Sequence, residues 1–525
     1  MKYRGKFLQS FGCIIPLISA VILYAPILSI WFFWDDIPLL IRAVNLNTRW
    51  HIFMPDGYKF RPIQALINSI NCQLFFDQVP FFTHLCSLIC FLGSVVLVYK
   101  IAEIIYPYSR KYPLIASMFF TLFPGNVYGL SKFYLGQNLV TFFCLLLFWL
   151  SIRYFGKSVK VVFFGSLLIS LFALFSKEDG FVLVFAIPLL SCLLLNSKRE
   201  NNRFIKKDLP VFYTGILLSA ALYLGMRLYS GTTFIGYGNH KLIFSLWNVF
   251  KHLIVNIFGL VYVGSTLDFF PNPKPTHILL SSIFSVLLAI TCLSIIYKAK
   301  VSVISVRRSY FLRVSLILAG LILAAMFPSS IIPNFTELYL LTIAPYYSLL
   351  IGLFLAIFLD GAFNCLNIRL KLPGIALILL LSLRMGLVTE NKVQHVVRLS
   401  GRALTWYRQL VDNLPDAGGR KINICFEVSS PEEREGLNIE RKRIFLKKIF
   451  PGSHRDRYSI YLRPDIYNFL DAVWVAKKVR KIEITVNDLS RFWPGEYTTY
   501  SYYSQVIRGN YVDSKVQCAN TFKFN

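Results

Sequence analysis

Residues 28–38 read LSIWFFWDDIP and place two neighbouring carboxylates, Asp35 and Asp36, directly after a long apolar run. That run extends from Phe7 to Phe33 and is long enough to cross a membrane once. Acidic side chains at the end of a membrane span are costly to hold near lipid, so a pair in this position is typical of chemistry or ion binding. The alternative interpretation is that the two carboxylates only mark the boundary with water.

The composition of the whole chain indicates an integral membrane protein. The chain has 525 residues, 55% of them hydrophobic, and its mean hydropathy of +0.55 is too high for a soluble enzyme. Apolar runs predict an all-α polytopic membrane protein with about eleven transmembrane helices. These runs lie at roughly 8–33, 81–104, 112–130, 138–152, 160–176, 181–195, 209–229, 276–297, 314–328, 341–359 and 373–389.

The positive charge of the chain predicts its orientation. A formal net charge of +28 would indicate nucleic-acid binding in a soluble protein, but here the cations lie mainly in alternate short loops. The positive-inside rule makes those loops cytoplasmic. We therefore expect a multi-pass protein of the bacterial cytoplasmic membrane, with no nucleic-acid partner. Its amino terminus would lie inside, and the acid pair and a carboxyl-terminal domain would lie outside.

One apolar segment, Phe244 to Val263, does not fit this alternation as a span. It contains Lys251, His252 and Asn256, and counting it as a span would move the cation-rich loop at 298–313 to the outer side. We therefore predict an interfacial or re-entrant helix on the outer face, and the sequence leaves its exact state open.

The first outer loop, residues 34–80, is much longer than the other early loops, and long ordered loops are usually functional. Its apolar residues predict two surface helices, one near 37–44 and one near 63–70. Lys59 and Arg61 stand just before the second helix, where a cation pair suits a phosphate group. The alternative is that both side chains only anchor to anionic lipid headgroups.

Other polar residues fall in loops that the orientation places on the same outer side. They could close over one cavity with Asp35, although a short charged turn can also be a simple solvated tip. The spans themselves contain almost no ionisable residues, which argues against an ion-coupled transporter. The loop residues are Lys132 and Gln137, the turn Ser176-Lys177-Glu178-Asp179-Gly180, and Asn334, Glu337 and Tyr339.

Residues 391–525 differ from the rest of the chain and predict a small soluble α/β domain outside the membrane. Strands are expected at 422–428 and 482–486 and a helix at 465–478. The domain holds Cys425 and Cys518, which an oxidising compartment would allow to pair, and the sequence leaves that pairing open.

Five pieces of the sequence, in this order, carry a resemblance to a known family. They are FWDDIPLLIRAVN, YKFRPIQALINSI, VPFFTHLCSL, SKEDG and TELYL, and the likeness spans roughly residues 8–390. The chain resembles the GT-C class of membrane glycosyltransferases, which take sugars from polyprenyl-phosphate carriers. It is most similar to O-mannosyltransferases with tetratricopeptide repeats and their bacterial relatives. The repeat domain is absent here, and Leu135-Gly136-Gln137-Asn138 stands where those relatives have Gly-Arg-x-Glu.

The resemblance implies a transmembrane catalytic domain over residues 1–390 and transfer of a hexose or pentose to a hydroxyl with inversion. It assigns the proton acceptor to Asp35, and to Asp36 the orientation of the acceptor or the binding of a divalent cation, the one cofactor left open. The leaving phosphate would be held by Arg61 and Lys59 and then by Lys177. Residues expected to line the cavity are His84, Glu178, Glu337 and Tyr339, of which His84 is equally well explained as structural.

Two other functions stay open at this point. One is a flippase or transporter for a lipid-linked glycan, and the other is a glycan polymerase that uses arginines of the outer loops. The expected partners are a polyprenyl-phosphate-linked sugar, a glycan or lipid-linked acceptor and membrane lipids. The sequence does not identify the sugar, the acceptor or the oligomeric state.

Overall fold

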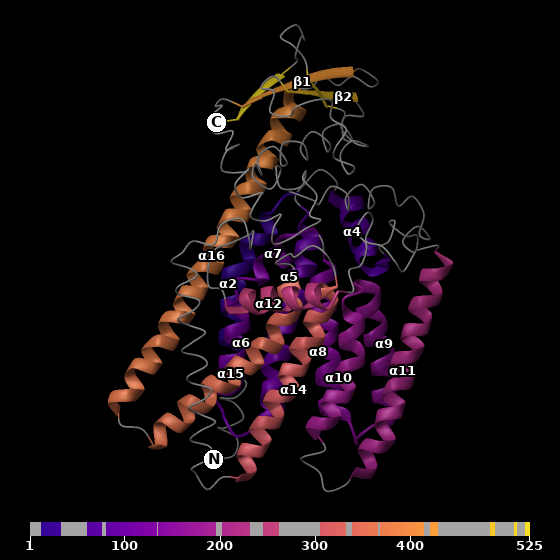
Figure 1. Cartoon of the computed structure of the whole chain (residues 1–525). Helices are drawn as coiled ribbons and strands as arrows, with labels where there is room; N and C mark the ends of the chain where they lie inside the picture. The colour runs from indigo at the N-terminus through magenta and orange to yellow at the C-terminus, as the bar shows by residue number, and fades with distance from the viewer. Residues whose placement is uncertain are drawn as a thin grey trace. The chain divides into compact units, whose positions relative to one another are not determined.

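The structure is a computed structural model, and Figure 1 shows the whole chain. It describes residues 12–32, 60–75, 80–133, 135–195, 202–230, 245–261, 305–331, 339–365 and 368–413, and four short strands beyond them. The chain divides into two compact units: Met1–Leu28, Leu46–Ile67 and Phe82–Gln394 form one, and Ser29–Asn45, Asn68–Phe81 and His395–Asn525 form the other. Several predictions fall outside the described residues: Asp35, Asp36, Lys59 and Glu337, the span at 276–297, the helix at 465–478 and Cys518.

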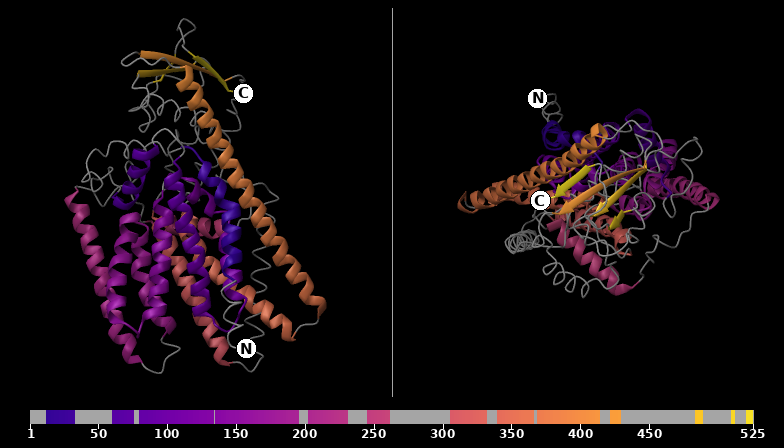
Figure 2. Two further views of the ribbon diagram at one scale, coloured as in Figure 1. Left: turned by 180° about the vertical axis from the view of Figure 1, so that it is seen from behind. Right: turned by 90° about the horizontal axis from the view of Figure 1, so that it is seen from above.

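The larger unit is built from apolar helices, because runs rich in Leu, Ile, Val and Phe satisfy their backbone hydrogen bonds internally in this form. Among the helices that the structure describes, six are long and apolar enough to cross a membrane. Figures 1 and 2 show how the helices are arranged. The described helices of the whole chain are α2 (Ile14–Tyr24), η1 (Ala25–Ser29), α4 (Pro62–Phe75), α5 (Phe81–Ile105), α6 (Tyr112–Leu122), α7 (Asn126–Ser131), α8 (Gly136–Tyr154), α9 (Val159–Ser176), α10 (Gly180–Leu195), α11 (Asn202–Tyr229), α12 (Leu246–Val261), α14 (Ser305–Ser330), α15 (Leu340–Cys365) and α16 (Ile368–Asn413).

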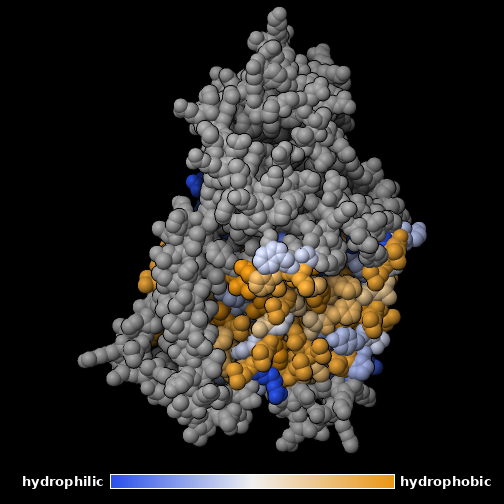
Figure 3. Space-filling view, viewed as in Figure 1, coloured by the Kyte–Doolittle hydropathy of each residue, from blue (hydrophilic) through white to orange (hydrophobic). Residues whose placement is uncertain are grey.

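The six span-length stretches are Phe81–Ile105, Gly136–Tyr154, Val159–Ser176, Asp208–Tyr229, Tyr310–Ser330 and Leu340–Ile357. Each overlaps a predicted span, so the all-α polytopic class is supported, whereas the number eleven stays a prediction. Three shorter apolar helices, Ile14–Ser29, Tyr112–Leu122 and Gly180–Leu195, overlap further predicted spans. Figure 3 shows a band of apolar surface across this face of the molecule.

Close helix crossings hold this unit together. α9 packs on α8 and α11, and α15 packs on α6. A Cβ added at Gly215 of α11 would lie 2.9 Å from the Phe163 carbonyl oxygen of α9, and one at Gly352 of α15 would lie 2.8 Å from Ala116 Cα of α6. Glycine therefore lets these backbones approach, as is common between membrane helices.

The predicted span at 112–130 is wrong as a single helix. α6 ends at Leu122, Phe123 is extended, and α7 begins at Asn126. Pro124 has no backbone N–H to continue the helix, and Asn126 Nδ2 donates to the Phe120 carbonyl at 2.6 Å in its place. The corner between these helices thus carries its own polar contact.

α12 confirms a helix in the segment Phe244 to Val263. Among its described residues, most of the large apolar side chains face outward and the polar ones face inward, the opposite of the arrangement on the surface of a soluble protein. Five large apolar side chains point outward, whereas His252 and Asn256 are buried, and Asn256 Nδ2 donates to Ser329 Oγ at 3.0 Å. With 16 residues it is shorter than the six span-length helices. Its placement at the membrane interface stays a prediction. The outward side chains are Leu246, Trp247, Phe250, Ile254 and Ile257.

The second unit contains a parallel sheet of four strands in the order β3-β2-β1-β4. The strands are β1 (Lys421–Val428), β2 (Glu483–Asp488), β3 (Gly509–Tyr511) and β4 (Asn520–Phe524). β1 lies between β2 and β4, with Lys421 opposite Glu483 and Ile424 opposite Asn520. β1 coincides with the strand expected at 422–428, and β2 overlaps the one expected at 482–486.

Candidate functional site

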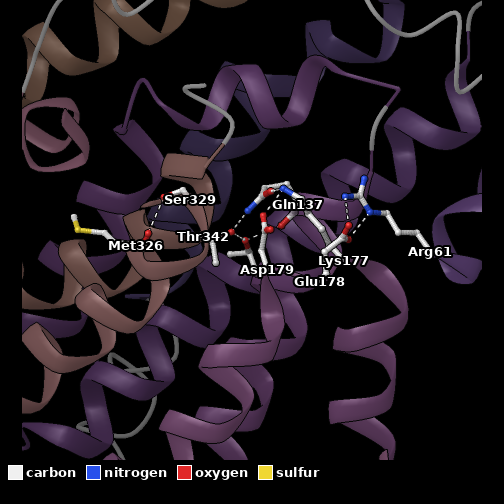
Figure 4. A network of polar contacts seen from close by, with 9 residues as sticks. Arg61, Gln137, Lys177, Glu178, Asp179, Met326, Ser329 and Thr342 are labelled. Carbon is white, nitrogen blue, oxygen red and sulfur yellow. Dashed lines mark hydrogen bonds and ion pairs between the residues drawn. The ribbon is translucent and has the colours of Figure 1, made fainter. Parts of the chain in front are cut away.

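The site begins with an ion pair that joins the residue just before α4 to the turn between α9 and α10 (Figure 4). Arg61 stands just before α4, and Glu178 lies in the turn. The guanidinium donates through Nε to Glu178 Oε2 at 2.7 Å and through Nη2 to Oε1 at 2.9 Å. Arg61 is buried, and the two parallel bonds fix its orientation as well as its position. The interpretation of Arg61 as a headgroup anchor is therefore wrong.

Aromatic rings support this pair from the side of α9 and α11. The Phe60 ring lies 6.0 Å from Phe175 and 5.9 Å from Tyr223, and all three belong to one apolar cluster. Arg227, in the last turn of α11, donates to the Tyr223 hydroxyl at 2.7 Å. The Tyr223 hydroxyl is also within electrostatic range of Glu178 and Arg61. Arg227 thus belongs to the same cluster of charges.

Lys177 is the most enclosed cation of the cluster. α9 ends at Ser176, and the extended backbone at Lys177 turns its side chain inward, where its exposed fraction is 1%. Its ammonium donates to the Gln137 Oε1 oxygen, pairs with the Asp179 carboxylate and lies 4.6 Å from the centre of the Tyr339 ring. The alternative that this turn is a solvated tip is therefore wrong.

Gln137 connects Lys177 to two further helices. It lies in the first turn of α8, and its Nε2 donates to Thr342 Oγ1 in the first turn of α15. The Thr141 hydroxyl donates to the Gln137 carbonyl at 2.7 Å and lies 3.4 Å from Thr342 Oγ1. Figure 4 shows the Gln137 and Thr342 side chains pointing toward each other from these two helices.

The charges of the turn affect the two ionisable groups differently. Burial tends to raise the pKa of Glu178, but the adjacent Arg61 guanidinium and its hydrogen bonds outweigh burial and lower that pKa to about 2. Burial lowers the pKa of Lys177, and the Asp179 carboxylate beside it acts in the opposite direction. Glu178 is therefore ionised at neutral pH, and the protonation of Lys177 depends on its immediate partners.

His84 and two lysines lie buried on neighbouring elements. His84 is on α5, one turn before Ser87, whose hydroxyl accepts a hydrogen bond from Asn138, the neighbour of Gln137. Lys132 lies 5.3 Å from the centre of the Tyr128 ring, and Lys392 donates to the Pro124 carbonyl at 3.2 Å. The structure thus places His84 on an element that contacts the start of α8.

The structure brings together four of the residues predicted from the sequence: Arg61, Lys177, Glu178 and Tyr339. Sequence reasoning did not assign roles to Asp179, Gln137, Thr342 or Arg227. Asp179 and Gln137 belong to loops whose polar character was noted, and Thr342 follows Tyr339 by less than one helical turn. Within the part of the chain that the structure describes, no three His, Cys, Asp or Glu side chains form a group able to hold a metal ion.

No protein-family model and no curated protein matches the chain. Among solved structures, it is similar to ArnT from Cupriavidus metallidurans in the apo state, with 11% identity and a TM-score of 0.49 over 95% of this chain and 90% of that chain. ArnT bound to undecaprenyl phosphate gives 12% identity and a TM-score of 0.46 over 83% and 87%. The archaeal oligosaccharyltransferase AglB from Archaeoglobus fulgidus, in complex with an inhibitory peptide and a dolichol-phosphate, gives 13% identity and a TM-score of 0.40. That match covers 81% of this chain and 62% of AglB.

Proposed function

We propose that this chain is a membrane glycosyltransferase that moves a sugar from a polyprenyl-phosphate carrier to a hydroxyl group of a glycan or lipid-linked acceptor at the outer membrane face. The observation that carries the proposal is the gathering of three buried cations, Arg61, Lys177 and Arg227, from separate elements around one turn. They lie at the carboxyl ends of α9 and α11 and just before α4.

The reaction would form a bond between the acceptor oxygen and the anomeric carbon and break the bond between that carbon and the phosphate oxygen. The carrier phosphate gains one negative charge as it leaves. Preorganised cations at the place where that charge develops lower the barrier without reorganising during the reaction. Arg61 offers a planar fork for phosphate oxygens and Lys177 a compact charge. Lys59, next to Phe60 in the chain, is assigned to the same group.

The acceptor proton would pass to Asp35 as the new bond forms. Asp36, its neighbour, would raise the pKa of one member of the pair and orient the acceptor, and it would hold a divalent cation if the reaction uses one. His84, Glu337 and Tyr339 would line the cavity. In this assignment the acid pair begins the first outer loop, and Lys59 and Arg61 lie within that loop, just before α4.

The distribution of polar groups supports an enzyme rather than a transporter. Within the described spans, hydroxyl groups make neutral contacts between helices, such as the Ser151 and Ser191 hydroxyls at 2.6 Å and the Tyr112 hydroxyl, which donates to the Leu349 carbonyl at 3.0 Å. Ion-coupled transporters normally need charged or strongly polar groups near the middle of the membrane. Chemistry at one surface needs them only at the helix ends, where this cluster is found.

The test is transfer of label from radiolabelled polyprenyl-phosphate sugars into glycan by membranes that contain the chain. Asp35→Asn is expected to abolish transfer while the protein still inserts. Glu103→Gln, which alters a surface ion pair with Lys100, is the matched control and should keep full transfer. Normal transfer by Asp35→Asn would remove the mechanism. A cavity open alternately to both sides in an accessibility map would favour the transporter.

A further inference from the structure

Gln137 connects the buried Lys177 ammonium to α8, on which Gln137 lies, and to α15. The contacts that it makes there are with neutral groups. Its side chain contacts Lys177 at one end and Thr342 at the other, and its backbone carbonyl accepts from Thr141. Gln137 has no exposed surface, and Thr342 is 2% exposed. This chain of contacts fixes Lys177 relative to α8 and α15.

The chemistry of the groups determines which way the Gln137 amide points. An ammonium can only donate, so the amide oxygen must face Lys177. The amide nitrogen then needs an acceptor, and the Thr342 hydroxyl oxygen is the partner within reach. If the Thr342 hydroxyl were removed, a buried N–H would lose its partner and the amide would lose its preferred orientation.

A glutamine has a second property that matters here: its oxygen accepts a hydrogen bond without bringing a negative charge. Lys177 is already paired with the Asp179 carboxylate. A carboxylate at position 137 would add a second anion beside the ammonium and weaken its attraction for a phosphate. A neutral acceptor holds the ammonium in place and leaves that attraction unchanged.

We propose that Gln137, oriented by Thr342, is a positioning residue that aims the Lys177 ammonium at the phosphate of the carrier without neutralising it. The inference rests on the proposed function, because it assigns the aim of Lys177 to a phosphate. Among the residues that the structure describes, the charged and aromatic groups facing Lys177 include Asp179 and Glu178 on its own turn, Arg61 before α4 and the Tyr339 ring before α15. A substitution at position 137 changes the group that accepts a hydrogen bond from Lys177 and leaves these other groups in place.

Two substitutions at this position should act in opposite directions. Gln137→Leu removes an acceptor from the ammonium and should lower the pKa of Lys177, because the charged form loses a hydrogen bond. Gln137→Glu adds a negative charge and should raise that pKa. The alkaline limb of the pH profile of kcat/KM should therefore move to lower pH in Gln137→Leu and to higher pH in Gln137→Glu. Loss of packing alone would not move the limb in two directions.

A second measurement does not depend on transfer. In protein labelled with carbon-13 only at lysine Cε, the signal of Lys177 is assigned by its absence from Lys177→Arg, and its shift is followed against pH. Opposite movements of this titration in the two Gln137 variants support the positioning role. Identical titrations in the wild type and both variants would overturn it. If the titrations move as expected but the wild type transfers no sugar, the proposed function fails and the positioning of Lys177 stands.

Conservative variants guard against unfolding. Thr342→Val keeps the volume of the side chain and should shift the pKa of Lys177 in the same direction as Gln137→Leu, but by less. Thr342→Ser keeps the hydroxyl and should give the wild-type titration curve. Asn138→Leu is the matched control, since Asn138 is also a buried carboxamide but bonds to Ser87 and to the Gly129 carbonyl. Its Lys177 titration should be unchanged, and a shift as large as that of Gln137→Leu would refute the assignment.

Discussion

Two of the kinds of buried polar contact in the larger unit can be compared, and they differ in charge and in place. Inside the spans, hydroxyls meet other neutral groups: Ser151 contacts Ser191 at 2.6 Å, and Ser219 donates to the Leu167 carbonyl at 2.5 Å. At the turn between α9 and α10, the contacts join charged groups, Arg61 with Glu178 and Lys177 with Asp179. The neutral contacts lie within the helices, and the charged contacts lie in the segments just before or after them.

The difference separates packing from chemistry. A neutral hydrogen bond between membrane helices is worth little and can be formed wherever two small residues meet. Buried charges cost several kcal/mol each to remove from water, and their pairing returns that cost only in good geometry. A fold has no packing reason to collect four of them, Arg61, Lys177, Asp179 and Arg227, around one turn. The charged turn is therefore where function is expected, and the spans are where it is not.

The largest effect should come from Arg61→Ala. The change removes a phosphate-binding fork and leaves Glu178 without its bidentate partner, so transfer should fall by about 100-fold or more. Steady-state transfer with a radiolabelled carrier measures it. Arg61→Lys should recover part of the activity, because it keeps the charge but loses the planar fork. Equal activity in Arg61→Ala and the wild type would mean that the charged turn serves packing after all.

A smaller loss is expected for Lys177→Met, which keeps much of the side-chain length without the charge. Transfer should fall by about ten- to 100-fold, because one of several cations facing the phosphate is lost. The control is Lys111→Met, since Lys111 pairs with Asp360 at 3.3 Å on an exposed surface and should not affect transfer. Equal losses of transfer in the two variants would mean that transfer depends on the total positive charge of the protein and not on Lys177 in particular.

Both of these predictions use residues that could be recognised in the sequence. Arg61 and Lys177 could be selected because each stands at the edge of an apolar run, on the side that the positive-inside rule assigns. The helices were also visible, since long apolar runs in membranes leave few other structures possible. The break between α6 and α7 could have been predicted from Pro124 and Gly125, which interrupt the apolar pattern.

The partners of these cations could not be predicted. Glu178 is adjacent to both Lys177 and Asp179 in the chain, and only the geometry of the turn makes Glu178 the partner of Arg61 and Asp179 that of Lys177. Thr342 lies 205 residues from Gln137, so the contact between them depends on how α8 packs near α15. A side chain such as Gln137 has no charge or periodicity that distinguishes it from other polar loop residues. Such pairings come from tertiary packing, for which a single sequence gives no signal.

The charged turn also predicts how stability depends on pH. The pKa of Glu178 in the folded chain is about 2, below its ordinary value of 4.5. The ion pair therefore contributes fully above pH 4.5, and its contribution is lost as the pH falls from 4.5 toward 2. The unfolding temperature in lipid nanodiscs should decline over that window. Glu178→Gln should start lower and decline less, and an equal decline in both proteins would assign the acid sensitivity to other carboxylates.

The smallest effect on stability is expected in the spans, where the neutral contacts between helices can be tested in turn. Ser151→Ala leaves the Ser191 hydroxyl without its cross-helix partner and should cost about 1 kcal/mol of stability or less. The double change to alanine removes both hydroxyls and should cost less than the sum of the single changes, because no buried hydroxyl is left without a partner. Transfer should be unaffected in all three variants. A variant that folds normally but loses transfer would show that the neutral contacts inside the spans take part in the chemistry, and the division between the two kinds of contact would fail.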